Sequence, residues 1–217
     1  MIWSRMRSSA AVALCVVKRL APTTPPSPIP RDAFRAPISA LRYSFSLQSR
    51  PDRHLRSSSP KNRSYGLYGD YLMVTGKFEK AVEQMRETVE LDSQQYNSHM
   101  RLGFAYANLN RYAEAESEFK KAEEISPGSV TSLGALAYAY GLEGKKWQAE
   151  RMFPEVKALA MQTGHPSMVS LVYVGLYQKG QATRWLEKAY EQRDYYLEHL
   201  RSDAKFQDLE RSFRSAQ

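Results

Sequence analysis

The 217-residue chain is predicted to be all-α: a solenoid of about four helix–turn–helix repeats, with a C-terminal capping helix and a disordered N-terminal head. Two observations predict this fold class. Compact residues recur at a nearly constant interval, and the composition of the first 64 residues differs sharply from that of the rest. A constant period of roughly 20–50 residues is typical of arrays in which one supersecondary unit is copied and stacked.

The repeating pattern is a small residue, an alanine twelve positions later and another compact residue seven positions after that. Successive sets are offset by 34, 34 and 33 residues. Small side chains let two helices approach closely, and large neighbours fill the gaps beside them. The pattern therefore predicts pairs of antiparallel helices. The four sets are Gly69/Ala81/Thr88, Gly103/Ala115/Ala122, Ala137/Ala149/Val156 and Ser170/Ala182/Ala189.

The period also places the individual helices and turns. The first helices of the pairs are expected at about 64–75, 96–108, 130–142 and 166–177. The second helices are expected at about 78–91, 112–125, 146–161 and 181–193. Glycine and asparagine favour the ends of helices, so four such residues are expected in the turns within the repeats. These are Gly76, Asn110, Gly144 and Gly180.

Two segments depart from the regular pattern. Pro154 lies inside the third of the second helices, where it is expected to kink or break the helix near Glu150. Beyond residue 193 the repeat stops, and residues 194–217 are expected to form a C-terminal cap. Its helix, at 203–214, carries apolar residues at helical spacing and would cover the last hydrophobic face of the solenoid.

Residues 1–61 are predicted to be a disordered basic head, rich in proline, serine and arginine. Residues 1–64 contain 12 Lys or Arg and 2 acids, whereas residues 65–217 contain 19 and 21. The formal net charge of +8 therefore comes from the head. Because the folded part carries no excess of basic residues, this distribution argues against nucleic-acid binding by that part. Proline-rich, apolar-poor sequence buries too little surface to offset the entropy of ordering.

The head has some features of a targeting segment and lacks others. The apolar run from Ala10 to Val17 is far shorter than the roughly 20 residues of a membrane span. Lys18 and Arg19 follow where a secretory cleavage site would lie. A cytoplasmic location is expected. The alternative is an organellar location, because an Arg/Ser-rich and acid-poor N-terminus is also typical of transit peptides.

The second repeat resembles the tetratricopeptide repeat (TPR), a 34-residue helix–turn–helix unit, at the positions Leu102, Gly103, Tyr106, Tyr112, Ala115, Phe119, Ala122 and Pro127. The resemblance covers about 62–193, divided near 62–95, 96–129, 130–162 and 163–193, and implies a right-handed solenoid. The stretch from Leu171 to Arg211 resembles the C-terminal TPR arrays of bacterial regulatory proteins. In those proteins the arrays are often joined to transcription regulators or kinases, and neither domain is found in these 217 residues.

The resemblance also implies a binding groove, because the first helices of TPR arrays line a concave surface. The residues expected there are Asp70, Met73, Asn97, Met100, Phe104, Asn108, Tyr138 and Leu171. Methionine and aromatic side chains suit an adaptable peptide groove. Some TPR domains bind a C-terminal carboxylate with basic groove residues. At the matching positions only Arg101 is basic, which argues against that specialised function.

No catalytic or metal-binding pattern stands out. The four histidines, His54, His99, His165 and His199, form no HExxH motif, and no G-x-S-x-G motif is present. The single cysteine, Cys15, cannot form an intramolecular disulfide. We therefore expect neither an enzyme nor a protein with a cofactor, a metal or a small-molecule substrate.

The leading functional hypothesis is a protein–protein interaction scaffold that binds a peptide or partner segment in the concave groove. The main alternative is a detached regulatory arm of a bacterial signalling or transcription-regulator protein whose effector domain is missing. Nucleic-acid binding through the basic head would instead weaken steeply with salt. A monomer is expected, because three or four repeats are enough to fold alone.

Overall fold

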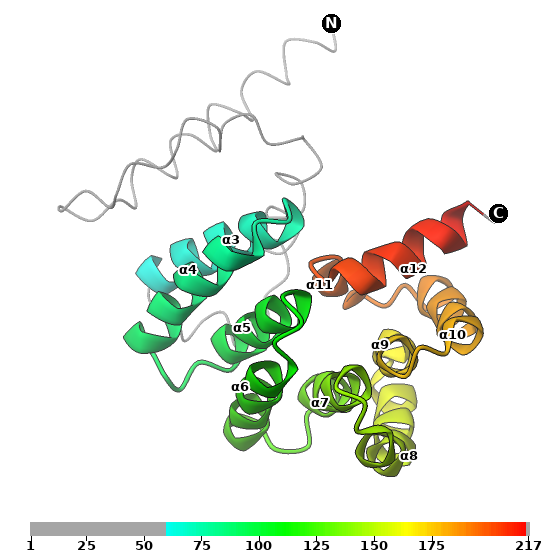
Figure 1. Ribbon diagram of the computed structural model, residues 1–217. Helices are drawn as coiled ribbons and strands as arrows, with labels where there is room; N and C mark the ends of the chain where they lie inside the picture. Colours follow the sequence, from blue (N-terminus) through cyan, green and yellow to red (C-terminus); the bar gives the residue numbers. More distant parts are fainter. Residues whose placement is uncertain (1–59, 216–217) are drawn as a thin grey trace, which may run out of the picture.

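The computed structural model describes residues 60–215, and every regular element in that range is a helix (Figure 1). The predicted head lies outside the described residues, except for Pro60 and Lys61, which begin the first helix. The helices are α3 (Pro60–Val74), α4 (Phe78–Leu91), α5 (Tyr96–Asn108), α6 (Tyr112–Ile125), α7 (Val130–Leu142), α8 (Lys146–Thr163), α9 (Pro166–Gly175), α10 (Lys179–Glu191), α11 (Leu197–Leu200) and α12 (Ala204–Arg214).

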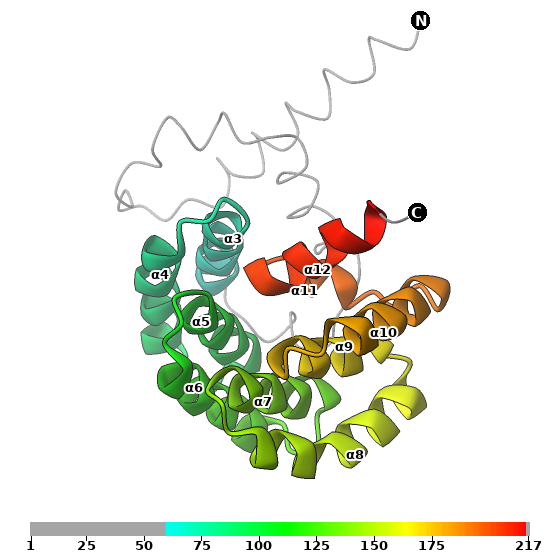
Figure 2. The ribbon, with the colours of Figure 1, turned by 45° about the vertical axis from the view of Figure 1, so that its right-hand side comes forward.

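The first eight of these helices form the solenoid that the period predicts. Each odd-numbered helix from α3 to α9 packs against the helix that follows it, and neighbouring pairs pack against each other. Figure 2 shows the pairs arranged around a curve, with α3, α5 and α7 on the inside and α4, α6 and α8 on the outside. None of the helices within residues 60–215 is long and apolar enough to cross a membrane.

The four turns within the pairs share one backbone motif. In each, an amide three residues beyond the last helical residue donates to a carbonyl five residues earlier, which satisfies groups that the helix end leaves unpaired. Each of these bonds measures 2.9 Å: Lys77 to Leu72, Arg111 to Tyr106, Lys145 to Tyr140 and Gln178 to Tyr173. The residue before each donor has a positive φ: 73° at Gly76, 58° at Asn110, 84° at Gly144 and 58° at Tyr177.

The fourth turn differs from the sequence prediction. Gly180, expected in this turn, lies inside α10, and Tyr177 takes the left-handed position instead. The 33-residue step explains the difference, because it brings Tyr177 into register with Gly144. A tyrosine at positive φ is strained relative to glycine.

Close helix contacts explain the small residues of the repeat. A Cβ atom added at Gly103 in α5 would lie 2.7 Å from Cδ1 of Phe119 in α6. A Cβ atom added at Gly69 in α3 would lie 2.9 Å from Cε of Met85 in α4. Both distances are too short for ordinary carbon contacts, so each glycine makes room for a large side chain of the partner helix.

The expected break at Pro154 does not occur. α8 runs without interruption from Lys146 to Thr163 and has 18 residues. Pro154 removes the hydrogen bond to the carbonyl of Glu150. Both residues are exposed, so solvent can reach that carbonyl. The helix is followed by Gly164, whose φ of 77° is left-handed.

The chain beyond α10 folds back into the solenoid. Figure 2 shows α11 and α12 within the inner curve, where α12 also packs against α9 and α10. The predicted capping helix at 203–214 corresponds to α12. Asp203 precedes it, and its Oδ1 accepts a hydrogen bond of 2.8 Å from the backbone amide of Phe206, which is the usual capping arrangement. We refer to residues 194–214 as the C-terminal segment.

Candidate protein-interaction surface

The eight residues predicted to line the groove lie on the inner helices, and we call them the inner surface: Asp70, Met73, Asn97, Met100, Phe104, Asn108, Tyr138 and Leu171. Only Asn97 and Asn108 are half-buried, and the other six are buried. The hydrogen bonds described below show that the C-terminal segment lies against part of this surface. The exposed fractions of Phe104 and Tyr138 are 6% and 0%, so neither ring of the inner surface is open to solvent.

Tyr138, from the middle of α7, holds the start of α12. Its hydroxyl donates a hydrogen bond of 2.6 Å to Oδ2 of Asp203, and both residues are fully buried. Burial raises the pKa of the Asp203 carboxyl, although the bonds from Tyr138 and the Phe206 amide favour the carboxylate. Burial and the nearby carboxylate raise the pKa of Tyr138 well above its ordinary value, so its hydroxyl keeps its proton and remains a donor.

Asn108, the last residue of α5, binds the main chain beside Asp203. Its Oδ1 accepts from the amide of Ala204 at 2.8 Å, and its Nδ2 donates to the carbonyl of Ser202 at 3.4 Å. Nδ2 also donates to the carbonyl of Phe104 in its own helix at 2.9 Å, which fixes the orientation of the side-chain amide. One side chain on the inner surface thus bonds to both backbone groups that flank Asp203.

Lys205 extends this contact to the turn between α5 and α6. Its ammonium group donates to the carbonyl of Ala107 at 3.2 Å and to Oδ1 of Asn110 at 3.3 Å. It also lies 5.7 Å from the ring centroid of Tyr112, within the range of a cation–π interaction. The start of α12 is therefore fastened to the second repeat as well as to the third.

The acidic end of the inner surface is internally neutralised. Asp70 in α3 is buried, and its Oδ1 accepts from Nε of Arg101 at 3.0 Å. Burial raises the pKa of Asp70, and the attraction of Arg101 opposes that shift. Gly66 makes room for the pair, because a Cβ atom there would lie 2.9 Å from Nη1 of Arg101. The one basic side chain at the matching carboxylate-binding positions is therefore already paired with an acid.

The apolar members of the inner surface continue into the core. The ring of Phe104 meets that of Phe119 edge to face at 5.1 Å between centroids, and lies 6.3 Å from that of Tyr138. Met73, Met100 and Leu171 are 2%, 4% and 0% exposed. Met73, Met100, Phe104 and Leu171, with the ring of Tyr138, give the inner curve its apolar wall, while the amides and the tyrosine hydroxyl provide its polar contacts.

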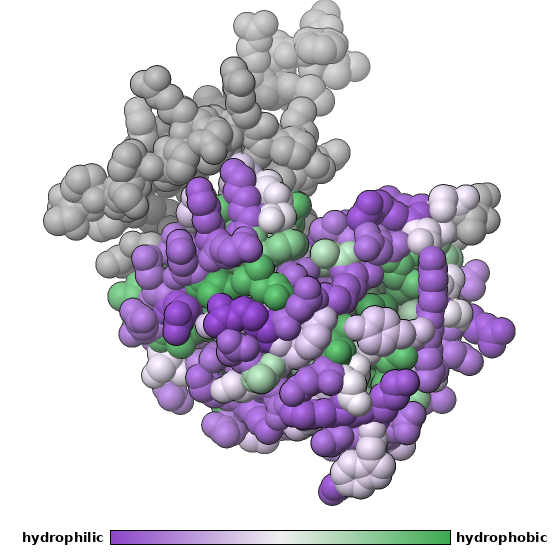
Figure 3. All heavy atoms as spheres, viewed as in Figure 1, coloured by the Kyte–Doolittle hydropathy of each residue, from purple (hydrophilic) through white to green (hydrophobic). Residues whose placement is uncertain are grey.

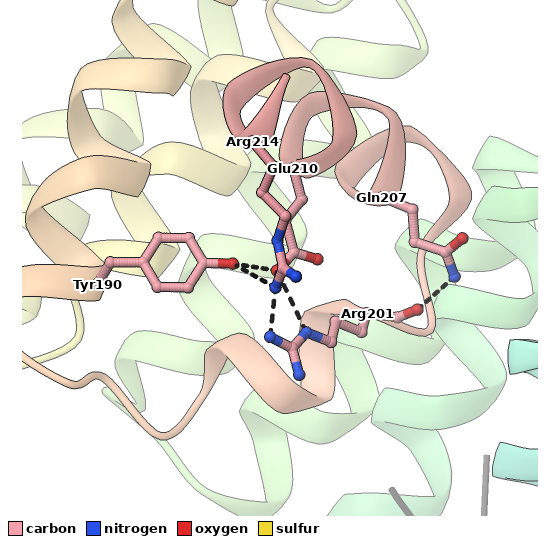
Figure 4. A network of polar contacts seen from close by, with 5 residues as sticks. All are labelled: Tyr190, Arg201, Gln207, Glu210 and Arg214. Carbon is pink, nitrogen blue, oxygen red and sulfur yellow. Dashed lines mark hydrogen bonds and ion pairs between the residues drawn. The ribbon is translucent and has the colours of Figure 1, made fainter. Parts of the chain in front are cut away.

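A polar network anchors the far end of α12, and the sequence analysis did not predict it (Figure 4). Glu210 accepts from Arg201 at 3.1 Å, from Arg214 at 2.8 Å and from the hydroxyl of Tyr190 in α10. Burial alone would raise the pKa of Glu210, but these donors outweigh it and lower the pKa. The rings of Tyr190 and Phe213 stack with centroids 5.7 Å apart. The (i, i+4) spacing of Glu210 and Arg214 was a signal for part of this network.

The outside of the molecule is mostly polar. Figure 3 shows hydrophilic residues over most of the face in view, with smaller patches of hydrophobic residues among them. The large exposed hydrophobic side chains of the described residues are Leu91 in α4, Trp147 and Met161 near opposite ends of α8, Tyr177 between α9 and α10, and Tyr195 after α10. Within residues 60–215, no group of three acidic, histidine or cysteine residues is placed to hold a metal ion.

Comparison with known proteins agrees with this architecture. A family model for the tetratricopeptide repeat matches residues 96–129, which are the second repeat. Human Superkiller complex protein 3 is 28% identical over 142 residues, covering 60% of this chain and 9% of that protein. Protein O-mannosyl-transferase Tmtc3 of Drosophila melanogaster is 33% identical over 63 residues, covering 29% of this chain and 7% of that protein. The chain thus spans less than a tenth of the length of either curated relative.

The fold is also found in a solved structure. A thermophilic TPR protein of Thermus thermophilus aligns with a TM-score of 0.53 at 19% identity, over 82% of this chain and 88% of that chain. Stacked helix pairs that repeat every 33 or 34 residues define the molecule as a helical repeat protein. The matched repeat and the common fold support the tetratricopeptide repeat as the unit of this array. Proteins of this family generally serve as non-enzymatic scaffolds for protein–protein interaction.

Proposed function

We propose that this chain is a protein-interaction scaffold whose inner surface binds a helical segment of a partner protein. The observation that carries the proposal is the seating of the start of α12 on this surface. Asn108 bonds to the main chain on both sides of Asp203, and Tyr138 bonds to its carboxylate. A surface that holds one helix N-terminus in this way has the donors and acceptors to hold another.

The chemistry of the surface suits a peptide better than a small molecule. Main-chain groups of a bound segment satisfy Asn108 without regard to sequence, and pockets for individual side chains then provide specificity. The inner curve combines these polar contacts with a rigid apolar wall that contains Phe104 and Met100. The scaffold is proposed to act as a monomer and without chemistry of its own.

Partner capture with matched variants tests the proposal. The full-length chain carries an affinity tag, and proteins retained from a lysate are identified by mass spectrometry. The inner-surface variant is Asn97→Ala with Asn108→Ala, because both side chains are half-buried and their loss leaves the apolar core in place. The control is Glu124→Gln, an exposed residue of the outer helix α6.

The expected result is a set of partners that the wild-type chain and the Glu124→Gln control retain and the double variant loses. Circular dichroism confirms that all three chains have the same helix content. If the correctly folded double variant retains every partner, the inner surface is not the binding site.

A further inference from the structure

We propose that the C-terminal segment is an internal ligand of the inner surface. The partner that displaces it presents a helix with an acidic N-cap residue and an aromatic residue three positions later. The inference rests on the proposed function, because it specifies which kind of helical segment the inner surface binds. In this chain the corresponding residues are Asp203 and Phe206.

The reach of the segment distinguishes it from a simple end cap. A solenoid needs its last repeat covered, and α12 does this by packing against α9 and α10. Residues 202–205 go further, to α5, α7 and the α5–α6 turn. The bond from Ala204 to Asn108 joins residues 96 positions apart, and the bond from Tyr138 to Asp203 joins residues 65 positions apart. These contacts bypass the last repeat and lie on the inner surface.

The contacts at this end have the form of peptide recognition. Asn108 bonds to backbone groups, which any peptide supplies. The sequence of the bound segment is recognised through two of its side chains, both buried. Asp203 is fully buried between the Tyr138 hydroxyl and the Phe206 amide, and the side chain of Phe206 is also fully buried. Asp208 on the same helix is 69% exposed on its side chain and is not read by the inner surface.

The same contacts show why the segment is replaceable. Asp203 makes no ion pair with any basic residue of the described chain, so its charge is stabilised mainly by hydrogen bonds, with a smaller contribution from the positive charge of Lys205. Burial of a carboxylate without a counter-charge is costly. The N-terminal end of α12 therefore carries a buried carboxylate without an ion pair, whereas at the other end Glu210 bonds to two arginines. A partner helix that repeats the Asp203 contacts can exchange with it.

The covalent link gives the internal ligand its advantage. A tethered segment competes at an effective concentration on the order of millimolar when its linker is short. An external segment with the same sequence must therefore bind weakly to the wild-type chain. Substitutions that weaken binding of the C-terminal segment to the inner surface should let the external peptide bind there more tightly.

The experiment uses the full-length chain and a synthetic peptide with the sequence of residues 201–214, labelled with fluorescein at its N-terminus. Fluorescence anisotropy measures peptide binding to the wild-type chain and to the Asp203→Ala/Phe206→Ala chain. We expect the peptide to bind the variant chain at least about tenfold more tightly, because its internal competitor is weakened. A peptide with Asp203→Ala should lose at least about tenfold of this affinity, while a peptide with Asp208→Ala should keep it.

Equal affinity for the two chains, or no binding to either, overturns the inference. It is also overturned if the peptide changes at positions 203 and 208 have the same effect. If the double variant fails to fold, the test moves to the ¹⁵N-labelled wild-type chain titrated with unlabelled peptide to millimolar concentration. The amide resonances of Ala204 and Phe206 should then shift to new positions, and unchanged resonances overturn the inference.

The two proposals can fail separately. If the peptide discriminates between the chains but partner capture does not depend on Asn97 and Asn108, the proposed function fails and the internal ligand remains. If capture depends on these residues but the peptide binds both chains equally, the partner binds by other chemistry and the internal-ligand inference fails.

Discussion

Phe119 in α6 occupies the space that a side chain at Gly103 in α5 would need, since a Cβ atom there would lie 2.7 Å from Cδ1 of its ring. Phe119 is fully buried and cannot move without disturbing its neighbours. We therefore expect Gly103→Ala to destabilise the chain by about 1–3 kcal/mol through overpacking. Urea unfolding followed by circular dichroism measures the change.

Gly180 provides the matched control for this prediction. It lies in α10 with open space around its Cα, so Gly180→Ala meets no neighbour. Alanine is the better helix former, and this substitution should leave stability unchanged or raise it by up to about 1 kcal/mol. Equal losses at Gly103 and Gly180 would show that α5 and α6 are not in close contact at this point.

Removal of the Phe119 ring should leave a cavity where Gly103→Ala causes overpacking, and should lower stability by more. Phe119→Ala leaves a cavity in the centre of the second helix pair, and we expect a loss of about 3–5 kcal/mol. Because each repeat is stabilised by its neighbours, hydrogen exchange should accelerate in α5 and α7 as well as in α6. Glu124→Ala, on the exposed side of the same helix, should change stability by less than about 0.5 kcal/mol.

The bond between Tyr138 and Asp203 gives a third test, on the third repeat. Tyr138→Phe removes one hydroxyl and leaves the buried Asp203 carboxylate with one donor fewer. Loss of such a partner costs about 1–3 kcal/mol. Thermal unfolding measures the loss against Tyr173→Phe, a partly buried tyrosine of α9 whose ring packs against Phe153. A Tyr138→Phe chain as stable as the Tyr173→Phe chain would contradict the buried bond.

Much of the solenoid could be predicted because its packing imposes a constant spacing on the sequence. The predicted helix at 112–125 coincides with α6, and the glycine at 103 is required by the ring at 119. Turn chemistry was less predictable at the 33-residue step. Tyr177 takes the left-handed position there, whereas the sequence pattern favoured the nearby Gly180.

The inner surface was only half predictable. Its eight residues follow from their repeat positions, and Phe206, Leu209 and Phe213 show that a helix at 203–214 must cover something apolar. The hydrophobic stripe of a helix predicts that this face is buried, but it does not predict which surface the face packs against. Tyr138 lies 65 residues from Asp203, and Asn108 lies 96 residues from Ala204, so local sequence carries no signal for these contacts.

His199 in α11 should make the chain less stable in mild acid. Burial, with a further contribution from the positive charge of Arg101, lowers the pKa of His199 to about 4, from about 6.5 in the unfolded chain. Between these two values the unfolded state binds a proton that the native state does not, so stability falls as the pH falls. The loss between pH 7 and 5 should be about 1–2 kcal/mol. Urea unfolding at several pH values should show it in the wild-type chain but not in a His199→Gln chain.

His99 in α5 should act in the opposite direction and above this range. Its Nδ1 lies 2.7 Å from Oε2 of Glu118, and its Nε2 lies 2.9 Å from the carbonyl oxygen of Ser93. A carbonyl oxygen and an ionised carboxylate can only accept hydrogen bonds. Both ring nitrogens of His99 must therefore donate, so both carry protons. The hydrogen bond to Glu118 raises the pKa of His99, although burial opposes it. Burial raises the pKa of Glu118, but the bonds from His99 and Lys121 outweigh burial and lower it.

The pH dependence that follows has a definite sign. The native state holds the His99 proton to a higher pH than the unfolded state does, so the pair contributes fully below about pH 6.5. Its contribution is lost as the pH rises through the raised pKa of the folded protein. The wild-type chain should therefore lose stability in urea unfolding between pH 6.5 and 8, whereas a His99→Gln chain should not. His199→Gln is the control, since His199 is neutral in both states over most of this range and its replacement should leave the slope unchanged. If wild-type stability rises with pH here, or the His99→Gln chain keeps the wild-type slope, then His99 is not a doubly protonated partner of Glu118.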